Sequence, residues 1–148
     1  MSYNIRRLRF FVDDVYGSLQ ENQTVAEQFF LSEDDHELEE MMCMMVPYAH
    51  YSSFWGVARD ELATKAVHTQ EKEYLRLSWT GGITPLTSST FIRAGYAHLT
   101  KGSFLSDLPI VGPALSMLFQ ERVIESLVVR NGKIVFRDLG YNWRLGVH

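Results

Sequence analysis

The side chains best suited to bind a soft metal ion lie in one run of methionines. Four methionines surround Cys43 between residues 41 and 45, and His50 follows. Thioethers, thiolates and imidazoles are ligands for copper(I). On a helix, however, Met41 and Met45 share a face while the methionines between them point elsewhere, so one ion cannot use them all. We therefore predict no metal site and expect these methionines to fill core gaps or a contact surface.

Acid–base chemistry has one weak candidate in this sequence. Cys43 and His50 are a nucleophile and a base, but no spacing brings them together, and we expect Cys43 to be buried. His68 follows Asp60 and Glu61 and forms the one grouping with acid–base potential. The histidines match no H-E-x-x-H pattern. We predict no catalytic residues and no cofactor.

Two further patterns resemble ligand loops without matching them. The acidic run at residues 33–40 lacks the alternating ligands and the glycine of a calcium loop, so we interpret it as the solvated start of a helix. Gly81 and Gly82 precede several serines and threonines but lack the phosphate-loop lysine, and Pro85 interrupts them. A strand–turn–helix connection with a serine cap is the expected structure there.

The segment 41–58, MMCMMVPYAHYSSFWGVA, contains no charged residue and is rich in methionine and aromatic side chains. Such side chains must be buried, either inside the domain or against another chain, and the sequence leaves both possibilities open. Adjacent Phe10 and Phe11 diverge by about 100° on a helix, so at least one leaves the buried stripe. The predicted interaction residues are Phe10, Phe11, Met44, Tyr48, Tyr51, Phe54, Trp55 and Trp143.

Length and charge narrow the class of protein. A chain of 148 residues is expected to form one domain over residues 1–148, mainly helical over 1–70 and mixed over 71–148. The net charge of −4 argues against a nucleic-acid partner, which requires a basic surface.

Cysteine usage and hydropathy suggest a location. A single cysteine forms no intramolecular disulfide, which favours the cytoplasm or another reducing compartment. The first residues lack the apolar core of a signal peptide, so none is expected. Pro47, His50 and Gly56 interrupt the uncharged segment, so we expect no transmembrane segment.

Apolar periodicity predicts helices in the first half of the chain. Side chains recur at three- and four-residue steps over residues 5–19, and Thr24 opens a second helix through Leu31. Ser32 is a good N-cap for a third helix that Pro47 ends. A fourth helix is expected from about Ser53 to Val67.

The second half predicts a sheet with short helices. Alternating residues predict a strand at about 73–80, and serine caps predict a helix from Ser88 or Ser89 to Lys101. Another helix is expected from Pro113 to about Arg122. Asn131-Gly132 between two β-branched runs predicts a tight hairpin, because both turn residues need a positive φ.

These elements predict an α+β fold: a helix-rich N-terminal half packed on a small antiparallel sheet with a C-terminal β-hairpin. The favoured function is a non-enzymatic interaction or assembly subunit that self-associates or docks on a protein partner. The alternative is a small-ligand-binding protein or enzyme with a pocket between helices and sheet, using a histidine and carboxylates. A concave site in which His50, His68 or His98 lies within hydrogen-bond reach of an acid or of Cys43 would favour the alternative.

Overall fold

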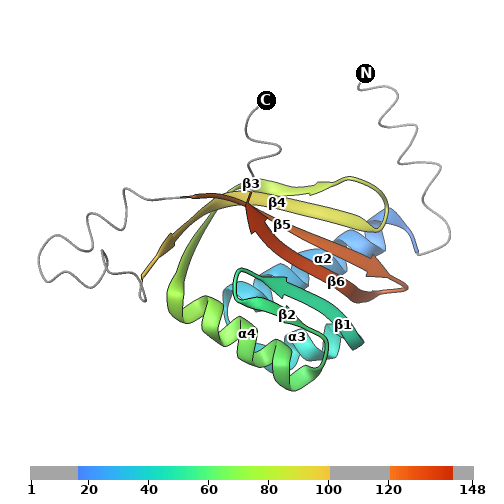
Figure 1. The fold of residues 1–148 in the computed structure, drawn as a ribbon. Coiled ribbons are helices and arrows are strands. Elements are labelled where there is room, and N and C mark those ends of the chain that lie inside the picture. The colour runs from blue at the N-terminus through green and yellow to red at the C-terminus, as the bar shows by residue number, and fades with distance from the viewer. Residues whose placement is uncertain (1–16, 101–120, 142–148) are drawn as a thin grey trace, which may run out of the picture.

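The computed structural model describes residues 17–100 and 121–141, which contain three helices and six strands (Figure 1). The helices are α2 (Leu19–Asp34), α3 (Leu38–Met44) and α4 (Glu61–Tyr74). The strands are β1 (Met45–Ser53), β2 (Gly56–Ala58), β3 (Leu75–Pro85), β4 (Thr90–Leu99), β5 (Glu121–Arg130) and β6 (Lys133–Tyr141).

All six strands belong to one sheet with the order β2-β1-β6-β5-β4-β3. Strands β1 and β6 run parallel, and every other neighbouring pair is antiparallel. The three helices lie on the same side of this curved sheet (Figure 1). The α+β class is therefore confirmed, with a helix-rich N-terminal half, but the sheet is larger than expected and mixed.

The main apolar core fills the space between the helices and the sheet. Ala26, Phe29 and Phe30 project from α2 onto Phe91 of β4, and Leu127 of β5 packs in the same cluster. All five side chains are at most 2% exposed. Burying large apolar side chains of this kind contributes roughly 1.5–3 kcal/mol each, so this layer fixes α2 against the sheet.

The predicted hairpin is confirmed. Arg130 pairs with Lys133 across a two-residue turn in which Asn131 and Gly132 have φ values of 52° and 77°. These left-handed conformations are what the Asn-Gly pair provides. The helix predicted at residues 24–31 lies inside α2, which begins earlier because the Ser18 hydroxyl accepts a hydrogen bond from the Glu21 amide.

Residues 45–58 are strands β1 and β2, so the helices predicted to reach Pro47 and to start near Ser53 are wrong there. Pairing with β6 and β2 satisfies the backbone of this segment. Helix α4 begins only at Glu61, where the Asp60 carboxylate accepts from the Ala63 amide at 2.7 Å. A good cap decided where this helix begins.

The helix predicted from Ser88 or Ser89 to Lys101 is also wrong, because residues 90–99 form the interior strand β4. Its residues 91, 93, 95 and 97 are buried, which is the two-residue period of a strand. Small residues interrupt that alternation in the sequence. The serines instead belong to the β3–β4 connection, where the Thr87 hydroxyl accepts from the amides of Ser89 and Thr90.

Two predicted helices fall largely outside the described residues, namely 5–16 of the first and 113–120 of the last. Where the latter prediction continues, Glu121 and Arg122 lie in β5. Within residues 17–100 and 121–141, no helix combines the length and apolar character needed to span a bilayer.

Candidate functional site

Four charged side chains meet in the protein interior around Arg137, and we name Glu33, Glu71, Glu125 and Arg137 the interior charge cluster. The Arg137 guanidinium donates from Nε to Glu125 at 2.6 Å and from Nη2 to Glu33 at 3.1 Å. It also donates to both oxygens of Glu71 at 2.9 Å and to the carbonyl oxygen of Ser52 at 3.0 Å. All four cluster side chains are at most 2% exposed.

The fold brings these residues together from four separate elements. Glu33 is in the last turn of α2, Glu71 is on α4, Glu125 is on β5 and Arg137 is on β6. In the hairpin register Leu127 lies opposite Arg137, so Glu125 is its diagonal neighbour on the same face. The site could not be recognised by spacing, but two charged residues on the inward face of a predicted hairpin were a usable indication.

A second guanidinium extends the cluster toward the surface. Arg93 of β4 donates to Glu125 at 2.7 Å and to both oxygens of Asp34 at 2.8 and 2.9 Å. Its guanidinium carbon also lies 4.1 Å from the Phe30 ring centre and 3.9 Å from that of Trp79. Stacking and two-point pairing hold Arg93 rigidly between sheet and helix.

The surroundings shift the pKa values of Glu125 and Glu33 in opposite directions. Burial alone would raise the pKa of Glu125, but the charges of Arg137 and then Arg93 lower it to about 2. Burial raises the pKa of Glu33 well above its usual range, and Arg137 opposes this rise only in part. Pairs of carboxyls whose pKa values are pushed apart are typical of acid–base sites.

Tyr51 and His68 form a buried pair beside the interior charge cluster. The Tyr51 hydroxyl lies 2.8 Å from His68 Nδ1, and both side chains are 0% exposed. Burial, followed by the charges of Arg137 and Lys72, lowers the pKa of His68 to about 3, so the imidazole is neutral at pH 7. Burial raises the pKa of Tyr51. The pair is therefore a neutral hydrogen bond between a phenol and an imidazole in the protein interior.

Glu33, His68 and Glu71 each offer one atom that could bind a metal ion, and these three atoms lie within 4.8 Å of one another. This spacing is compatible with a divalent cation. Arg137, however, already donates to Glu33 and Glu71, and its positive charge would face any ion placed there. These residues are therefore not assigned as metal ligands.

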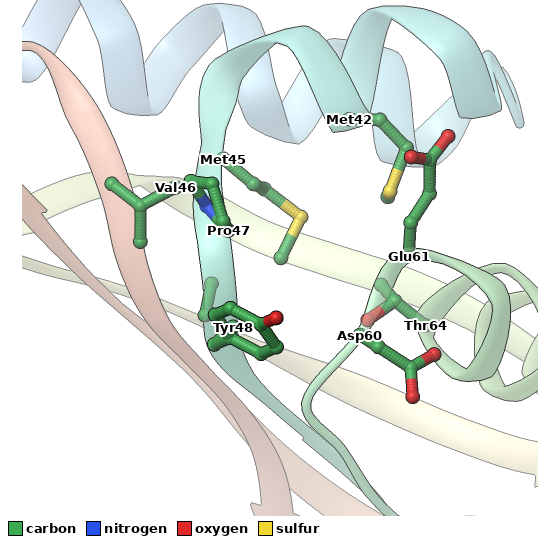
Figure 2. Close-up of a pocket in the computed structure, with 9 residues that line it drawn as sticks. Met42, Met45, Val46, Pro47, Tyr48, Asp60, Glu61 and Thr64 are labelled. Carbon is green, nitrogen blue, oxygen red and sulfur yellow. The ribbon is translucent and has the colours of Figure 1, made fainter.

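A pocket of about 300 Å³ opens between β1, α3 and the start of α4. In Figure 2, Met45 and Tyr48 on β1 face Asp60 and Thr64 across the pocket, and Met42 lies on α3 above them. The pocket is lined by Met42, Met45, Val46, Pro47, Tyr48, Ala49, Asp60, Glu61 and Thr64.

The pocket and the Tyr51–His68 pair occupy consecutive positions on the same two elements. Ala49 lines the pocket, and Tyr51 is two residues further along the buried face of β1. Thr64 lines the pocket, and His68 is one turn further along the buried face of α4. The pair therefore continues both walls of the pocket into the interior.

The structure separates the interaction residues predicted from the sequence. Phe10, Phe11 and Trp143 lie outside the described residues. Tyr51 is completely buried, so it is not a surface residue. Phe54 and Trp55 pack against a second apolar cluster that contains Leu75, Ala97, Val123 and Leu139. Met44 is half-buried, and Tyr48 is 79% exposed at the pocket.

Other sequence predictions about chemistry are corrected by the structure. Cys43 is exposed and not buried, and His50 stacks on Phe136 with ring centres 4.8 Å apart. Glu33, expected in a solvated helix start, is buried in the last turn of α2. His68 has Tyr51 and Glu71 as neighbours, with Nδ1 3.9 Å from a Glu71 oxygen.

Asp60 and Glu61, the acids first grouped with His68, have other roles. Asp60 caps α4, and Glu61 pairs with Lys65 at 3.1 Å. Gly81 and Gly82 lie within β3, so the predicted strand–turn–helix connection is a strand followed by a second strand.

Solved structures with the same fold share little sequence with this chain. A "putative polyketide cyclase" from Xanthomonas campestris pv. campestris superposes with a TM-score of 0.62 at 12% identity, covering 86% of this chain and 95% of that chain. An NTF2-like protein from Burkholderia xenovorans LB400 has a TM-score of 0.62 at 13% identity, covering 83% and 90%. TerC, co-crystallised with polyporic acid, has a TM-score of 0.56 at 11% identity, covering 86% and 95%.

The prediction of a non-enzymatic assembly subunit is wrong. Several similar structures are named as polyketide cyclases and not as assembly subunits. The uncharged segment that motivated the prediction is explained by the fold, because it supplies core residues, the wall of the pocket and the buried Tyr51.

Sequence comparison gives the family directly. No curated protein matches the chain. A family model described as an NTF2-like domain matches residues 6–145, which is nearly the whole chain. The helices packed on one mixed sheet agree with that match. The chain therefore belongs to the NTF2-like family.

Proposed function

We propose that this chain binds a small, largely apolar ligand in the pocket between β1, α3 and α4. The observation that carries the proposal is the position of the Tyr51–His68 pair, which continues both pocket walls and lies 3.9 Å from the buried carboxylate of Glu71. A pocket of this size with few polar groups is typical of a small-molecule site. The alternative function predicted from the sequence required this combination of pocket, histidine and carboxylates.

The pocket walls indicate the chemical class of the ligand. Met42 and Met45 supply flexible thioethers, which make favourable contacts with aromatic rings. The charged lining residues, Asp60 and Glu61, are both acidic. We expect neutral or cationic aromatic compounds to bind more tightly than anionic ones. Polyporic acid is a useful additional probe because TerC was co-crystallised with it.

Methionine-methyl NMR tests the binding proposal directly. A panel of neutral, cationic and anionic aromatic compounds is titrated into protein labelled at the methionine methyl carbons. We expect saturable shifts at Met42 and Met45, which line the pocket, and smaller ones at the half-buried Met44. If no compound gives saturable shifts at these two methyl groups, the proposed ligand class is wrong.

A matched pair of variants on α4 gives the control. Thr64→Leu adds volume to the pocket wall, whereas Thr69→Leu makes the same change on the exposed face of the helix. We expect Thr64→Leu to weaken binding at least about tenfold, which corresponds to about 1.4 kcal/mol, and Thr69→Leu to leave it unchanged. Equal effects of the two variants would place the ligand elsewhere.

Two expectations from the sequence accompany this proposal. The exposed thiol of Cys43, the single cysteine, favours a reducing compartment. A second copy of the chain or another protein is the expected macromolecular partner. Light scattering across a concentration series measures this association.

A further inference from the structure

One oxygen of Glu33 is buried without a hydrogen-bond donor. Glu33 Oε2 accepts from Arg137 Nη2 at 3.1 Å, but Oε1 has no partner among the described residues, although the side chain is only 2% exposed. The Glu125 and Glu33 carboxyl groups accept from Nε and Nη2 of the same Arg137 guanidinium, and each carboxyl shifts the pKa of the other. Two carboxylates cannot bond to each other unless one of them carries a proton.

A count of the buried charges also indicates that one of the buried carboxyl groups carries a proton. Glu33, Glu71 and Glu125 supply three negative charges when ionised, and Arg93 and Arg137 supply two positive charges. An excess of one buried negative charge is expensive in a low-dielectric interior. A single proton on one of the carboxylates makes the buried set neutral.

The hydrogen bonds indicate which carboxyl carries that proton. Glu125 accepts from two guanidinium groups at 2.6 and 2.7 Å. Glu71 accepts twice from Arg137 at 2.9 Å and once from the Ser53 hydroxyl at 2.7 Å. Glu33 accepts one bond from Arg137, at 3.1 Å. Since charge-assisted bonds stabilise the ionised form, the carboxylate of Glu33 receives the least such stabilisation of the three.

We propose that Glu33 retains a proton at neutral pH and donates it through Oε1 to Glu125, so that the folded protein contains a buried carboxylic acid. The raised pKa of Glu33, caused first by burial, agrees with this geometry. The ionisable groups that face Glu33 from the surrounding elements are Asp34 of α2, Tyr51 of β1, His68 and Glu71 of α4, Arg93 of β4, Glu125 of β5 and Arg137 of β6.

A bound divalent cation is the competing explanation for the excess negative charge. Glu33, His68 and Glu71 have the required spacing, and His68 Nε2 also has no partner among the residues that the structure describes. Arg137 argues against a cation because its guanidinium already contacts two of these three residues. The proton requires no displacement of Arg137.

Glu33→Gln distinguishes a protonated from an ionised Glu33. The amide of glutamine can donate to Glu125 and accept from Arg137, as the protonated acid does. If Glu33 holds a proton only in the folded state, unfolding releases that proton above about pH 4.5, so a higher pH favours unfolding of the wild type. The ratio of the wild-type unfolding constant to that of Glu33→Gln then rises by up to tenfold per pH unit. We expect this ratio to rise between pH 5 and 8, with the variant at least as stable at pH 8. A ratio that stays constant over this range would show that Glu33 is an anion in the folded protein.

Infrared spectroscopy on the intact protein gives an independent measurement without a ligand. The wild type at pH 7 should show a protonated-carboxyl C=O band that Glu33→Gln removes. Glu27→Gln, the same change on the exposed face of α2, should retain the band. Absence of the band at pH 7 overturns the proposal. It is also overturned if Mg²⁺, Mn²⁺ or Zn²⁺ raises the melting temperature of the wild type but not of Glu33→Gln.

Discussion

Arg137 and Glu71 form a two-point ion pair in the interior, with Nη1–Oε1 and Nη2–Oε2 distances of 2.9 Å each. Both side chains are at most 1% exposed. Removing two charges from water costs several kcal/mol per ion, and good geometry with further hydrogen bonds has to offset that cost. Arg137 has those bonds, since Glu33, Glu125 and Ser52 also accept from it.

Replacing Arg137 by methionine should strongly destabilise the protein. The change leaves the buried carboxylates of Glu71 and Glu125 without their main partner, a situation that costs about 3–5 kcal/mol in other proteins. Urea unfolding at pH 7 measures the difference. Arg76→Met removes an exposed arginine from β3 and should change the free energy of unfolding by less than about 0.5 kcal/mol. Equal stabilities of the two variants would contradict the importance of the cluster.

The local elements of this fold were predictable where short-range geometry decides them. Asn131-Gly132 allowed only a tight turn, and the hairpin followed from it. Strand β4 was mistaken for a helix because its small residues, such as Gly95, and a nearby serine concealed the two-residue period. Pairing with β3 and β5 on both sides decided its structure, and local residue propensities contain no information about such pairing.

The site was less predictable because its residues are far apart in the chain. Glu33 lies 104 residues from Arg137, and Glu71 lies 66 residues from it. Charged side chains are normally exposed, so the acidic run containing Glu33 was assigned to the surface. His68 was singled out, but with Asp60 and Glu61 as neighbours, because adjacency in sequence was the only information available. The fold supplied Tyr51 in their place.

His68 should make the protein less stable in mildly acidic solution. Its folded pKa of about 3 lies below the unfolded value of about 6.5, so the unfolded chain binds more protons between these values. The stability due to the neutral imidazole is present above pH 6.5 and is lost as the pH falls toward 3, by up to about 1.4 kcal/mol per pH unit.

Urea unfolding of wild type and His68→Gln between pH 7 and 4 isolates this contribution. The wild type should lose stability more steeply than the variant as the pH falls. Comparison with the variant is necessary because the proposed proton on Glu33 acts in the opposite direction above pH 4.5. Parallel slopes for wild type and His68→Gln would exclude a depressed His68 pKa.

Tyr48 combines backbone strain with a position at the pocket. It has a φ of 63°, and its side chain is 79% exposed, so little burial offsets a left-handed conformation. Asparagine tolerates this conformation, and Tyr48→Asn should raise the free energy of unfolding by about 0.5–1 kcal/mol. Tyr96→Asn, in the regular part of β4, should lower it. Because Tyr48 lines the pocket, the stabilised variant should bind aromatic ligands more weakly. Unchanged affinity would show that the strained residue makes no contribution to ligand binding.

Gly95 permits the close approach of β3 to β4. It pairs with Trp79, and a Cβ at this position would lie 2.2 Å from the carbonyl oxygen of Ser78 and 2.9 Å from the Trp79 ring. Backbone atoms of a paired strand cannot move aside cheaply, so Gly95→Ala should destabilise the protein by about 1–3 kcal/mol. Gly82→Ala provides the matched control, since a Cβ there meets nothing within 4 Å.

The two alanine variants also test how the second guanidinium is held. Trp79 stacks on Arg93, so displacing the indole should loosen the Arg93–Glu125 contact in addition to the strands. We therefore expect Gly95→Ala to change the indole environment, read by tryptophan NMR, and Gly82→Ala to leave it as in the wild type. Should Gly95→Ala prove as stable as Gly82→Ala, the separation of β3 and β4 would have to be larger than the structure gives.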